Sequence, residues 1–583
     1  MPEVSVTRHS AYVPPALQAG GRVWGLGLQL YALRSKRNWG IGDFSDLRDV
    51  VALAQRLGAG IVGINPLHAL RWLDPEAASP YAPTSRFFLN PLYVDVEAVP
   101  EFASDAAARA LVASESFQRD LTKARNAPLI RYDLVAACKR RVFESLFSAF
   151  RLSASVERRR AFGRFLMGGG ARLRRFAIYE ALDEHFASGA EQLRGWLDWP
   201  EAFRDPNSVE VERFAHVNHR RIDFHRYLQF VADEQLGAVA GTAKMLSIGL
   251  YRDLAVGVEA NGADVWAERR RYVLDRTVGA PPDSLGPLGQ NWGFPPLDPA
   301  DLERDRAAYF GALLRANMAH SGALRIDHVM SLLRLFWIPL GAEPKDGSYV
   351  LYPFALLRRT AIDASRRTKS LVVGEDLGTV PDGFRDELER AAILSTRLLL
   401  FERERDGRFA PPDRYPESAI ATATTHDLPT LPGWALGRDI EARRRAGLVS
   451  PADASSALSL RRLEATWLLE ALQSAGELDG AQVERLHRDL DGRSEDRHVY
   501  WPLVAAAYRF LARSPAKIVL LQLDDVLGEF DQVNLPGTFG EYPNWRRKIG
   551  AALEAVAEDE RLETLAAQLN ELVSGGTLTS KRS

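Results

Sequence analysis

Short apolar runs recur along the chain, and a polar or glycine-rich stretch follows each of them. The runs are rich in Val, Ile and Leu, and they are apolar at consecutive positions rather than at alternate ones. Such runs are typical of parallel strands that helices cover on both faces. Eight runs can be distinguished, and they begin at Val23, Ile61, Leu246, Leu324, Leu371, Ser395, Ala419 and Lys517.

Helical patterns lie between these runs. Residues 44–57 predict a helix that stops at the glycines of 58–60, and residues 302–319 and 384–394 predict two more. Eight strands that alternate with helices favour a closed (β/α)₈ TIM barrel of the α/β class over an open sheet.

Two intervals are too long for simple crossovers between strands. Residues 103–239 and residues 432–515 both have mainly helical patterns, and we interpret each as an inserted helical subdomain. We therefore expect a short N-terminal segment over 1–22, a barrel domain over 23–572 that carries both insertions, and a flexible tail over 573–583.

Composition narrows the class of partner. The chain has 583 residues, of which 46% are hydrophobic and 26% are charged, so a large buried core is possible. Its 74 basic and 76 acidic side chains nearly cancel, which argues against nucleic acid or an anionic membrane as the main partner. We expect a small or neutral substrate.

The cysteine content and the N-terminus indicate the compartment. Cys138 is the only cysteine and lies in an amphipathic helical pattern, so we expect a buried, inert thiol and no internal disulfide. The first twenty residues lack the apolar run of a signal peptide, and no stretch of eighteen apolar residues occurs. These features predict a cytoplasmic protein without a membrane span.

Several common catalytic motifs are absent from the sequence. It has no G-x-x-x-x-G-K-[ST], no H-E-x-x-H, no G-x-S-x-G and no pair of cysteines. A G-x-G-x-x-G does run from Gly58 to Gly63, but it leaves a helix and enters a strand, the reverse of the order that dinucleotide binding needs. We expect neither a cofactor nor a metal ion.

Three apolar runs end on carboxylates. Asp327 ends the run LRID, Glu375 and Asp376 end LVVGED, and His426 and Asp427 end ATATTHD. In a TIM barrel the active site forms at the C-terminal ends of the strands, and a buried charge there is costly without a partner or a function. The pattern favours a catalytic carboxylate site, with structural ion pairs or metal binding as the alternatives.

Paired carboxylates suit the cleavage of a glycosidic bond. One protonates the leaving oxygen, and at a separation of about 5–5.5 Å the other can attack and form a covalent glycosyl-enzyme. Arg325 lies two residues before Asp327 on the same side of an extended strand, where it can bind the carboxylate or the sugar, or form a simple salt bridge.

Aromatic side chains can bind the apolar face of a sugar ring. Tyr81 and Trp292 lie among Gly, Pro, Ser and Asn residues, which favours exposed loops. The full set of candidates is Trp39, Tyr81, Trp292, Tyr542 and Trp545.

Many longer segments resemble one enzyme family, the bacterial 4-alpha-glucanotransferases known as amylomaltases or disproportionating enzymes, within the alpha-amylase superfamily. These segments extend from Trp24 to Arg547 and so cover nearly the whole chain. They are QLYALRSKRNWGIGDFSDL, NPLHAL, SPYAPTSRFFLNPLY, LYRDLAVGV, GQNWGFPPLDP, LRIDHVMSLLRLFWIP, VVGEDLG, TTHDLPTLPGW and QVNLPGTFGEYPNWRRK.

The resemblance implies roles for individual residues. Asp327 matches the family's nucleophile, Glu375 its general acid/base, and Asp427 the third carboxylate, which stabilises the transition state. The matches to substrate-binding residues are Arg325, His426 and Tyr81 around the donor glucose, Gln290 and Trp292 in the loop over the acceptor, and Asp283 and Asn544.

The resemblance also implies an activity. A segment of an alpha-1,4-glucan is transferred to the 4-hydroxyl of another glucan or glucose with retention of configuration, so maltooligosaccharides and alpha-1,4-glucans are the expected partners. Longer members of the family carry an extra N-terminal domain, which we expect to be absent here because the first predicted strand begins at Val23. The rivals are a retaining alpha-glucan hydrolase of amylase type, a metal-dependent barrel enzyme and a non-catalytic glucan-binding protein.

Overall fold

The computed structural model describes residues 10–72, 74–282 and 288–575. At its centre lies a sheet of eight parallel strands. Each of the eight apolar runs supplies one strand, so this prediction is confirmed. The strands are β1 (Val23–Leu28), β2 (Ile61–Ile64), β5 (Gly249–Leu254), β8 (Ala323–Ile326), β11 (Leu371–Gly374), β12 (Ser395–Leu398), β13 (Ala419–Thr422) and β14 (Ile518–Gln522).

The sheet curls into a barrel. Its strand order is β11-β8-β5-β2-β1-β14-β13-β12, and the two end strands meet through a parallel bridge between Val373 and Leu394. Gly374 N–H donates to the Leu394 carbonyl at 2.7 Å, and Leu394 N–H donates to the Val372 carbonyl at 3.0 Å. These bonds join the end strands, as the predicted (β/α)₈ barrel requires.

Helix α1 (Phe44–Leu57) has the predicted bounds, because its end signals are strong. Asp43 accepts hydrogen bonds from the N–H groups of Ser45 and Asp46, and the Asp46 carboxylate accepts one from the Asp43 N–H, which completes a capping box. The helix ends at Gly58, whose φ of 83° is left-handed. The segment from Gly58 therefore turns from a helix into β2, as predicted.

Two predicted helices are shorter in the structure. Residues 302–319 form two helices, α10 (Pro299–Arg304) and α11 (Ala308–Met318), because Arg306 and Ala307 both have a φ of 55°, which a continuous helix cannot contain. Likewise α13 (Phe384–Arg390) stops before Ala392, whose φ is 54°.

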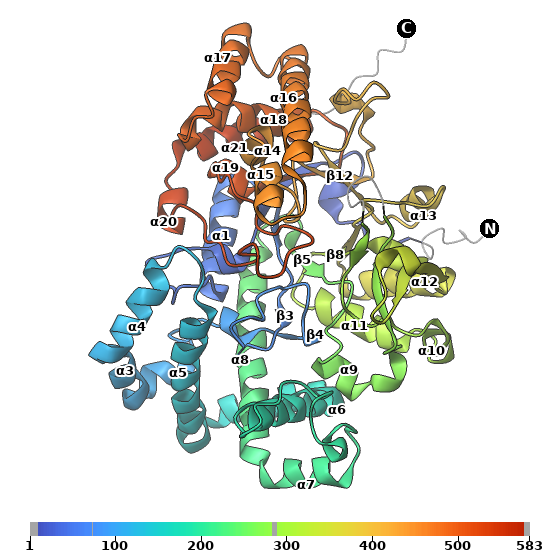
Figure 1. The fold of residues 1–583 in the computed structure, drawn as a ribbon. Coiled ribbons are helices and arrows are strands. Elements are labelled where there is room, and N and C mark those ends of the chain that lie inside the picture. Colours follow the sequence, from blue (N-terminus) through green and yellow to red (C-terminus); the bar gives the residue numbers. More distant parts are fainter. Residues whose placement is uncertain (1–9, 73, 283–287, 576–583) are drawn as a thin grey trace, which may run out of the picture.

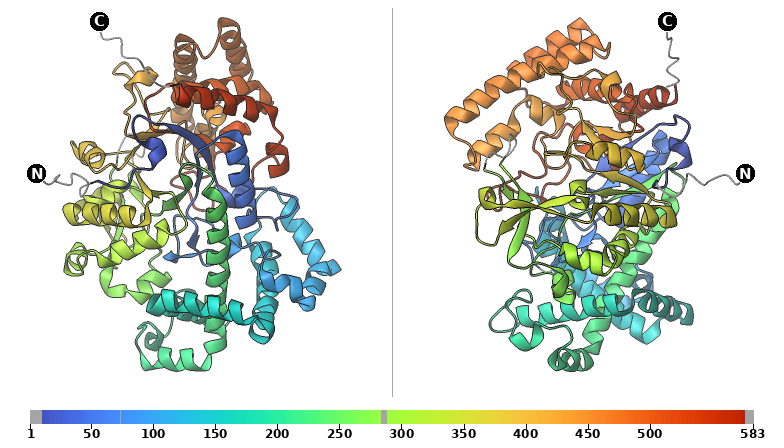
Figure 2. Two further views of the ribbon diagram at one scale, coloured as in Figure 1. Left: turned by 180° about the vertical axis from the view of Figure 1, so that it is seen from behind. Right: turned by 90° about the vertical axis from the view of Figure 1, so that its right-hand side faces the viewer.

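Most of the remaining helices lie within the two long intervals. Figures 1 and 2 show them at opposite ends of the molecule, with the barrel between them. The division of the chain into these units stays a prediction. The first interval holds α3 (Ala106–Ala113), α4 (Glu115–Asn126), α5 (Tyr132–Ser153), α6 (Val156–Ala187), α7 (Val209–Val217) and most of α8 (His219–Ala243), and the second holds α15 (Arg438–Arg445), α16 (Pro451–Ser474), α17 (Gly480–Asp491) and α18 (Trp501–Ala512).

Two small antiparallel sheets were not predicted. Sheet β10-β9-β6-β7 is continuous in sequence with the carboxyl end of β8, because β9 follows it after one short 3-10 turn. The bounds are β3 (His68–Ala69), β4 (Ser85–Leu89), β6 (Arg276–Ala280), β7 (Gln290–Asn291), β9 (Arg334–Pro339) and β10 (Ser348–Leu351).

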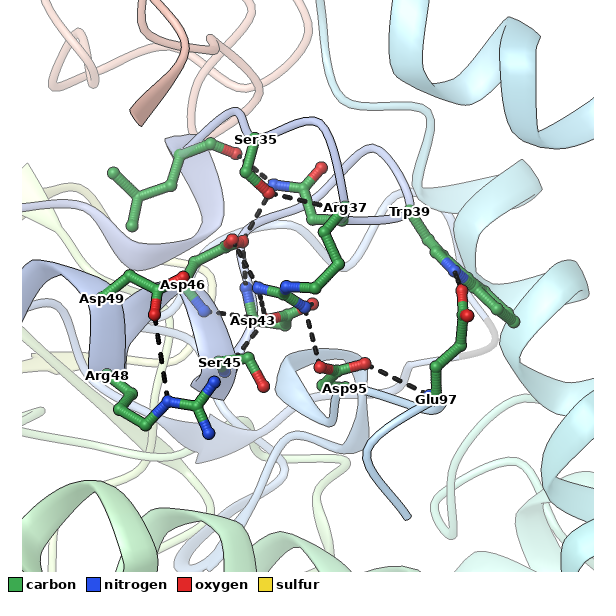
Figure 3. Close-up of polar contacts among 12 residues, drawn as sticks. Ser35, Arg37, Trp39, Asp43, Ser45, Asp46, Arg48, Asp49, Asp95 and Glu97 are labelled. Carbon is green, nitrogen blue, oxygen red and sulfur yellow. Dashed lines mark hydrogen bonds and ion pairs between the residues drawn. The ribbon is translucent and has the colours of Figure 1, made fainter. Parts of the chain in front are cut away.

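An ionic cluster fixes the connection between β1 and α1 (Figure 3). The Arg37 guanidinium contacts Asp43 at 3.0 Å, Asp46 at 2.6 Å and Asp95 at 2.7 Å. The three carboxylates are almost fully buried, whereas Arg37 is 35% exposed. The same arginine thus joins the cap of α1 to the segment after β4.

Buried side chains fill the barrel and its surroundings. One cluster inside the barrel takes a member from nearly every strand, including Ile61, Tyr251, Val373, Ile420 and Ile518. Cys138 is buried in α5, as predicted. Within the described residues, no helix combines the length and apolar character needed to cross a bilayer.

Candidate active site

Two of the predicted carboxylates lie at the ends of neighbouring strands. Asp327 directly follows β8 and Glu375 directly follows β11. The strands pair with Gly374 opposite Ile326, and Glu375 N–H donates to the Ile326 carbonyl at 3.0 Å. Because paired parallel strands lie about 4.8 Å apart, the backbones of Asp327 and Glu375 are adjacent.

Glu375 has surroundings that favour its protonated form near neutral pH. Its side chain is buried, and its two oxygens accept hydrogen bonds from His328 N–H and Leu377 N–H, each at 2.8 Å. Burial raises the pKa of Glu375 to about 7, helped by the Asp327 charge and opposed by Arg325 and the two N–H donors. A carboxyl group with this pKa can donate a proton and later accept one.

Arg325 gives Asp327 a cationic partner. One guanidinium nitrogen lies 2.8 Å from Asp327 Oδ1, and another lies 2.8 Å from Asp253 Oδ2. Burial lowers the pKa of Arg325, but the two carboxylates raise it more, so the guanidinium stays charged. The predicted contact between Arg325 and Asp327 is therefore present.

Asp253 is a site residue that the sequence prediction missed. It lies on β5 directly opposite Arg325 of β8, and its side chain is buried. Burial raises the pKa of Asp253, whereas Arg325 and Tyr81 lower it. Asp253 lies inside β5, whereas Asp327 and Glu375 directly follow their strands, so the search for carboxylates at the ends of apolar runs did not find it.

Asp427 follows β13, which only β12 separates from the strand of Glu375 in the closed barrel. It lies five residues beyond the end of β13, so it does not end the strand itself, as the pattern had suggested. Its Oδ2 lies 3.3 Å from His426 Nε2, and its Oδ1 accepts a hydrogen bond from the Asn534 amide at 2.7 Å.

A continuous chain of polar contacts links Asp427 with Asp327. The Tyr81 hydroxyl donates to Asp253 Oδ2 at 2.6 Å and lies 3.1 Å from His426 Nδ1. Asp253 in turn binds Arg325, which binds Asp327. Asp327 and Asp427 therefore belong to one network around the barrel mouth, and Glu375 lies beside Asp327 at the end of the neighbouring strand.

His426 and Asp427 stabilise each other as a charged pair. Burial lowers the pKa of His426, but Asp427 raises it more, and the net shift is upward. Burial likewise raises the pKa of Asp427, but His426 and the Asn534 amide bring it down to about 2. In its protonated form the His426 ring donates from both nitrogens, which suits the Tyr81 oxygen on one side and the Asp427 carboxylate on the other.

Aromatic rings line both sides of this network. Tyr81 and His426 stack with ring centroids 4.4 Å apart, and Trp545 lies 5.3 Å from the Tyr81 ring. On the Glu375 side, Trp292 packs edge-on against His328 at 5.2 Å and donates through Nε1 to the Gln290 amide oxygen at 2.9 Å.

Other sequence candidates lie elsewhere or have different contacts. The Asn544 side chain bonds Leu535 N–H and the Thr538 carbonyl and hydroxyl, so it holds the loop after Asn534. Trp39, one of the five aromatic candidates, is buried against Phe117 and is a packing residue. Asp283 lies outside the described residues.

No grouping of three or more His, Cys, Asp or Glu side chains within the described ranges has an arrangement that could hold a metal ion. The carboxylates of the site instead contact cationic side chains or N–H donors. Asp327 is ion-paired with Arg325, Asp427 is ion-paired with His426, and Glu375 accepts hydrogen bonds from backbone N–H groups.

Comparisons with known sequences agree with the geometry. Residues 28–552 match the family model described as 4-alpha-glucanotransferase. The chain is 37% identical over 574 residues to the 4-alpha-glucanotransferase of Haemophilus influenzae, covering 97% of this chain and 81% of that protein. It is also 37% identical over 573 residues to the enzyme of that name from Mycobacterium tuberculosis, covering 95% of this chain and 75% of that protein.

Solved structures give the same result. The amylomaltase from Corynebacterium glutamicum superposes with a TM-score of 0.82 at 30% identity, covering 95% of this chain and 76% of that one. The amylomaltase from Streptococcus agalactiae, solved in complex with acarbose, superposes with a TM-score of 0.73 at 18% identity, covering 95% of this chain and 99% of that one. At this low identity the similarity supports the fold alone. With a family model that matches most of its length and curated relatives that align over nearly all of it, the chain belongs to the 4-alpha-glucanotransferase family.

Proposed function

We propose that this glycosyltransferase-type enzyme moves a segment of an alpha-1,4-glucan to the 4-hydroxyl of another glucan or of glucose by a retaining double displacement. Asp327 is the nucleophile and Glu375 the general acid/base. The observation that carries the proposal is the adjacent placement of these residues after β8 and β11. Neutral maltooligosaccharides are the proposed substrates, in keeping with the near-zero net charge and with the family.

In the first step Asp327 attacks C1 of the donor glucose while Glu375 protonates the glycosidic oxygen. The C1–O bond breaks, the shortened glucan leaves with a free 4-hydroxyl, and an ester joins C1 to Asp327. In the second step the carboxylate of Glu375 takes the proton of an incoming 4-hydroxyl, whose oxygen attacks C1 and displaces Asp327. Two inversions retain the alpha configuration.

Other residues hold the sugar at the cleavage point. Asp427 stays ionised because of its low pKa, so it can bind sugar hydroxyls and stabilise the positive charge that develops on the ring. We assign Arg325, His426 and Tyr81 to the donor glucose, and Gln290 and Trp292 to the acceptor side. Asp283 and Asn544 stay substrate-binding predictions that rest on the family resemblance.

Incubation of the purified protein with maltotriose tests the proposal. Transfer predicts a ladder of longer oligosaccharides together with glucose or maltose, whereas a hydrolase would give only shorter sugars. Full activity in the presence of a chelator would exclude the metal-dependent alternative. The variant Asp327→Asn should lose transfer by about a thousandfold or more with an unchanged circular dichroism spectrum, because it lacks the attacking carboxylate. Near-normal turnover by this variant would remove Asp327 from its role.

A further inference from the structure

Trp545 has an unusual backbone conformation for a large side chain. Its φ is 60°, in the left-handed region that residues with a Cβ rarely adopt. Such a conformation persists only where the surrounding structure holds it in place, and it is concentrated at functional sites. The residue lies in the segment after β14 that also supplies Asn534 to Asp427.

The connection between α4 and α5 holds this backbone. The buried Tyr132 hydroxyl donates to the Trp545 carbonyl at 2.8 Å. Ile130 N–H donates to the Arg546 carbonyl at 2.7 Å, and Leu129 forms an antiparallel bridge with Arg547. Nearby, the Lys548 ammonium donates to the Ala124 carbonyl at 2.7 Å. Residues 124–132 of the first helical interval thus clasp residues 545–548 along their length.

The side chain of Trp545 packs against two residues of the proposed donor site. The residue is only 6% exposed, and its ring centroid lies 5.3 Å from that of Tyr81 and 5.5 Å from that of His426. Both of these rings are hydrogen-bonded or ion-paired to site carboxylates, Tyr81 to Asp253 and His426 to Asp427. The indole therefore packs against both rings, while their polar atoms contact the carboxylate network.

We propose that Trp545 is a positioning residue for the transfer reaction, and that the α4–α5 connection serves catalysis by holding it. The proposal rests on the proposed function, because it assigns Tyr81 and His426 to the donor glucose. Under this proposal the first helical interval contributes to catalysis by holding Trp545, although none of the proposed substrate contacts comes from that interval. Small displacements of groups that act in the transition state reduce turnover strongly.

Two substitutions of Trp545 test whether it is a positioning residue. Trp545→Leu removes the ring and keeps apolar bulk, whereas Trp545→Phe keeps a ring. With maltotriose we expect kcat to fall about tenfold or more in the Leu variant while KM changes less than about threefold, and we expect the Phe variant to recover most of the kcat. Thermal unfolding of both variants is measured in parallel. Equal kcat values for the two variants, or a kcat loss that follows only their unfolding temperatures, would show that Trp545 merely packs.

The substitution Tyr132→Phe tests whether the α4–α5 connection serves catalysis, because it deletes the hydroxyl that donates to the Trp545 carbonyl. Its matched control is Tyr500→Phe, another buried tyrosine whose hydroxyl donates to backbone carbonyls, those of Asp489 and Ser494. We expect kcat to fall severalfold for Tyr132→Phe and to stay unchanged for Tyr500→Phe. A normal kcat for Tyr132→Phe would overturn the role of the clasp.

Asp327→Asn, assayed alongside, distinguishes a failure of the proposed mechanism from a failure of the positioning role. If that variant keeps its turnover, the proposed mechanism fails. If it is inactive while Trp545→Leu keeps wild-type kcat, only the positioning role fails.

Discussion

At the scale of single residues, Glu375 and Asp427 make opposite contributions to the pH dependence of stability. The pKa of Glu375 is raised from 4.5 to about 7, so its unfolded form loses a proton at lower pH than its folded form. Ionisation therefore favours unfolding as the pH rises from about 4.5, and the penalty is complete above about pH 7. At about 1.4 kcal/mol per pH unit, the full effect is about 3 kcal/mol.

The variant Glu375→Gln does not ionise and should escape this penalty. We expect the free energy of unfolding of the variant, relative to wild type, to improve by a few kcal/mol between pH 4.5 and pH 8. Denaturant unfolding at several pH values measures this difference. A difference that stays constant with pH would mean that Glu375 has an ordinary pKa in the folded protein.

For Asp427→Asn, the stability relative to wild type should change with pH in the opposite direction. Because His426 and Asn534 lower the pKa of Asp427 to about 2, its ionised form stabilises the folded protein above the unfolded pKa of about 4, and this contribution disappears as the pH falls toward 2. The variant should therefore be less stable than wild type at pH 7 and approach it in acid. A deficit that grows in acid would contradict the assignment.

At the scale of elements, the cluster around Arg37 determines how α1 joins the barrel (Figure 3). Arg37→Met would leave three buried carboxylates without their cation and should cost about 3 kcal/mol, toward the low end for a broken buried pair because Arg37 is itself partly exposed. Arg48→Met is the control, since Arg48 and Asp49 are 3.8 Å apart and about half exposed, and such pairs contribute about 1 kcal/mol or less. Equal unfolding midpoints for the two variants would show that the cluster adds no stability.

Elements with strong local signals could be predicted from the sequence. The eight strands and the bounds of α1 follow from apolar runs, an acidic cap and a left-handed glycine. The break at Arg306 and Ala307 could not be predicted, because neither residue type signals a positive φ. The sheet that contains β9 and β10 was missed although β9 carries the apolar stretch LFWIP, because its partner β10 is short and mostly exposed and lacks such a stretch.

In the candidate site, too, some residues could be predicted from the sequence and others could not. Asp327 and Glu375 were found because each directly follows an apolar run. Asp253 was missed because it lies within its run, where an acidic residue is identified as a site residue only through its partners Arg325 and Tyr81. The support that Trp545 gives to His426 comes from segments more than a hundred residues apart, which no local pattern encodes.

At the scale of the whole molecule, the inserted helices do not share one core. Helix α5 and much of α8 pack into the main hydrophobic cluster, which includes barrel residues such as Trp24 and Leu521. The second half of α6 packs with α7 and Trp266 in a separate, smaller cluster. The first half of α6 buries little, since its buried side chains begin at Leu173, and the helix is interrupted at Gly170. Regions with few buried contacts open at a lower free-energy cost than the global unfolding of the protein.

Hydrogen exchange followed by mass spectrometry can detect this difference. We expect amides of residues 157–169 to exchange at least about a hundredfold faster than those in the buried part of α5, which belongs to the same interval but packs against the barrel. Residues 173–187 should have intermediate protection, because most of their buried apolar side chains belong to the smaller cluster. Equal protection of α5 and both halves of α6 would mean that the insertion opens as one unit. The expected gradient would instead place the most stable part of the insertion next to the clasp on Trp545, where the proposed catalytic role requires rigidity.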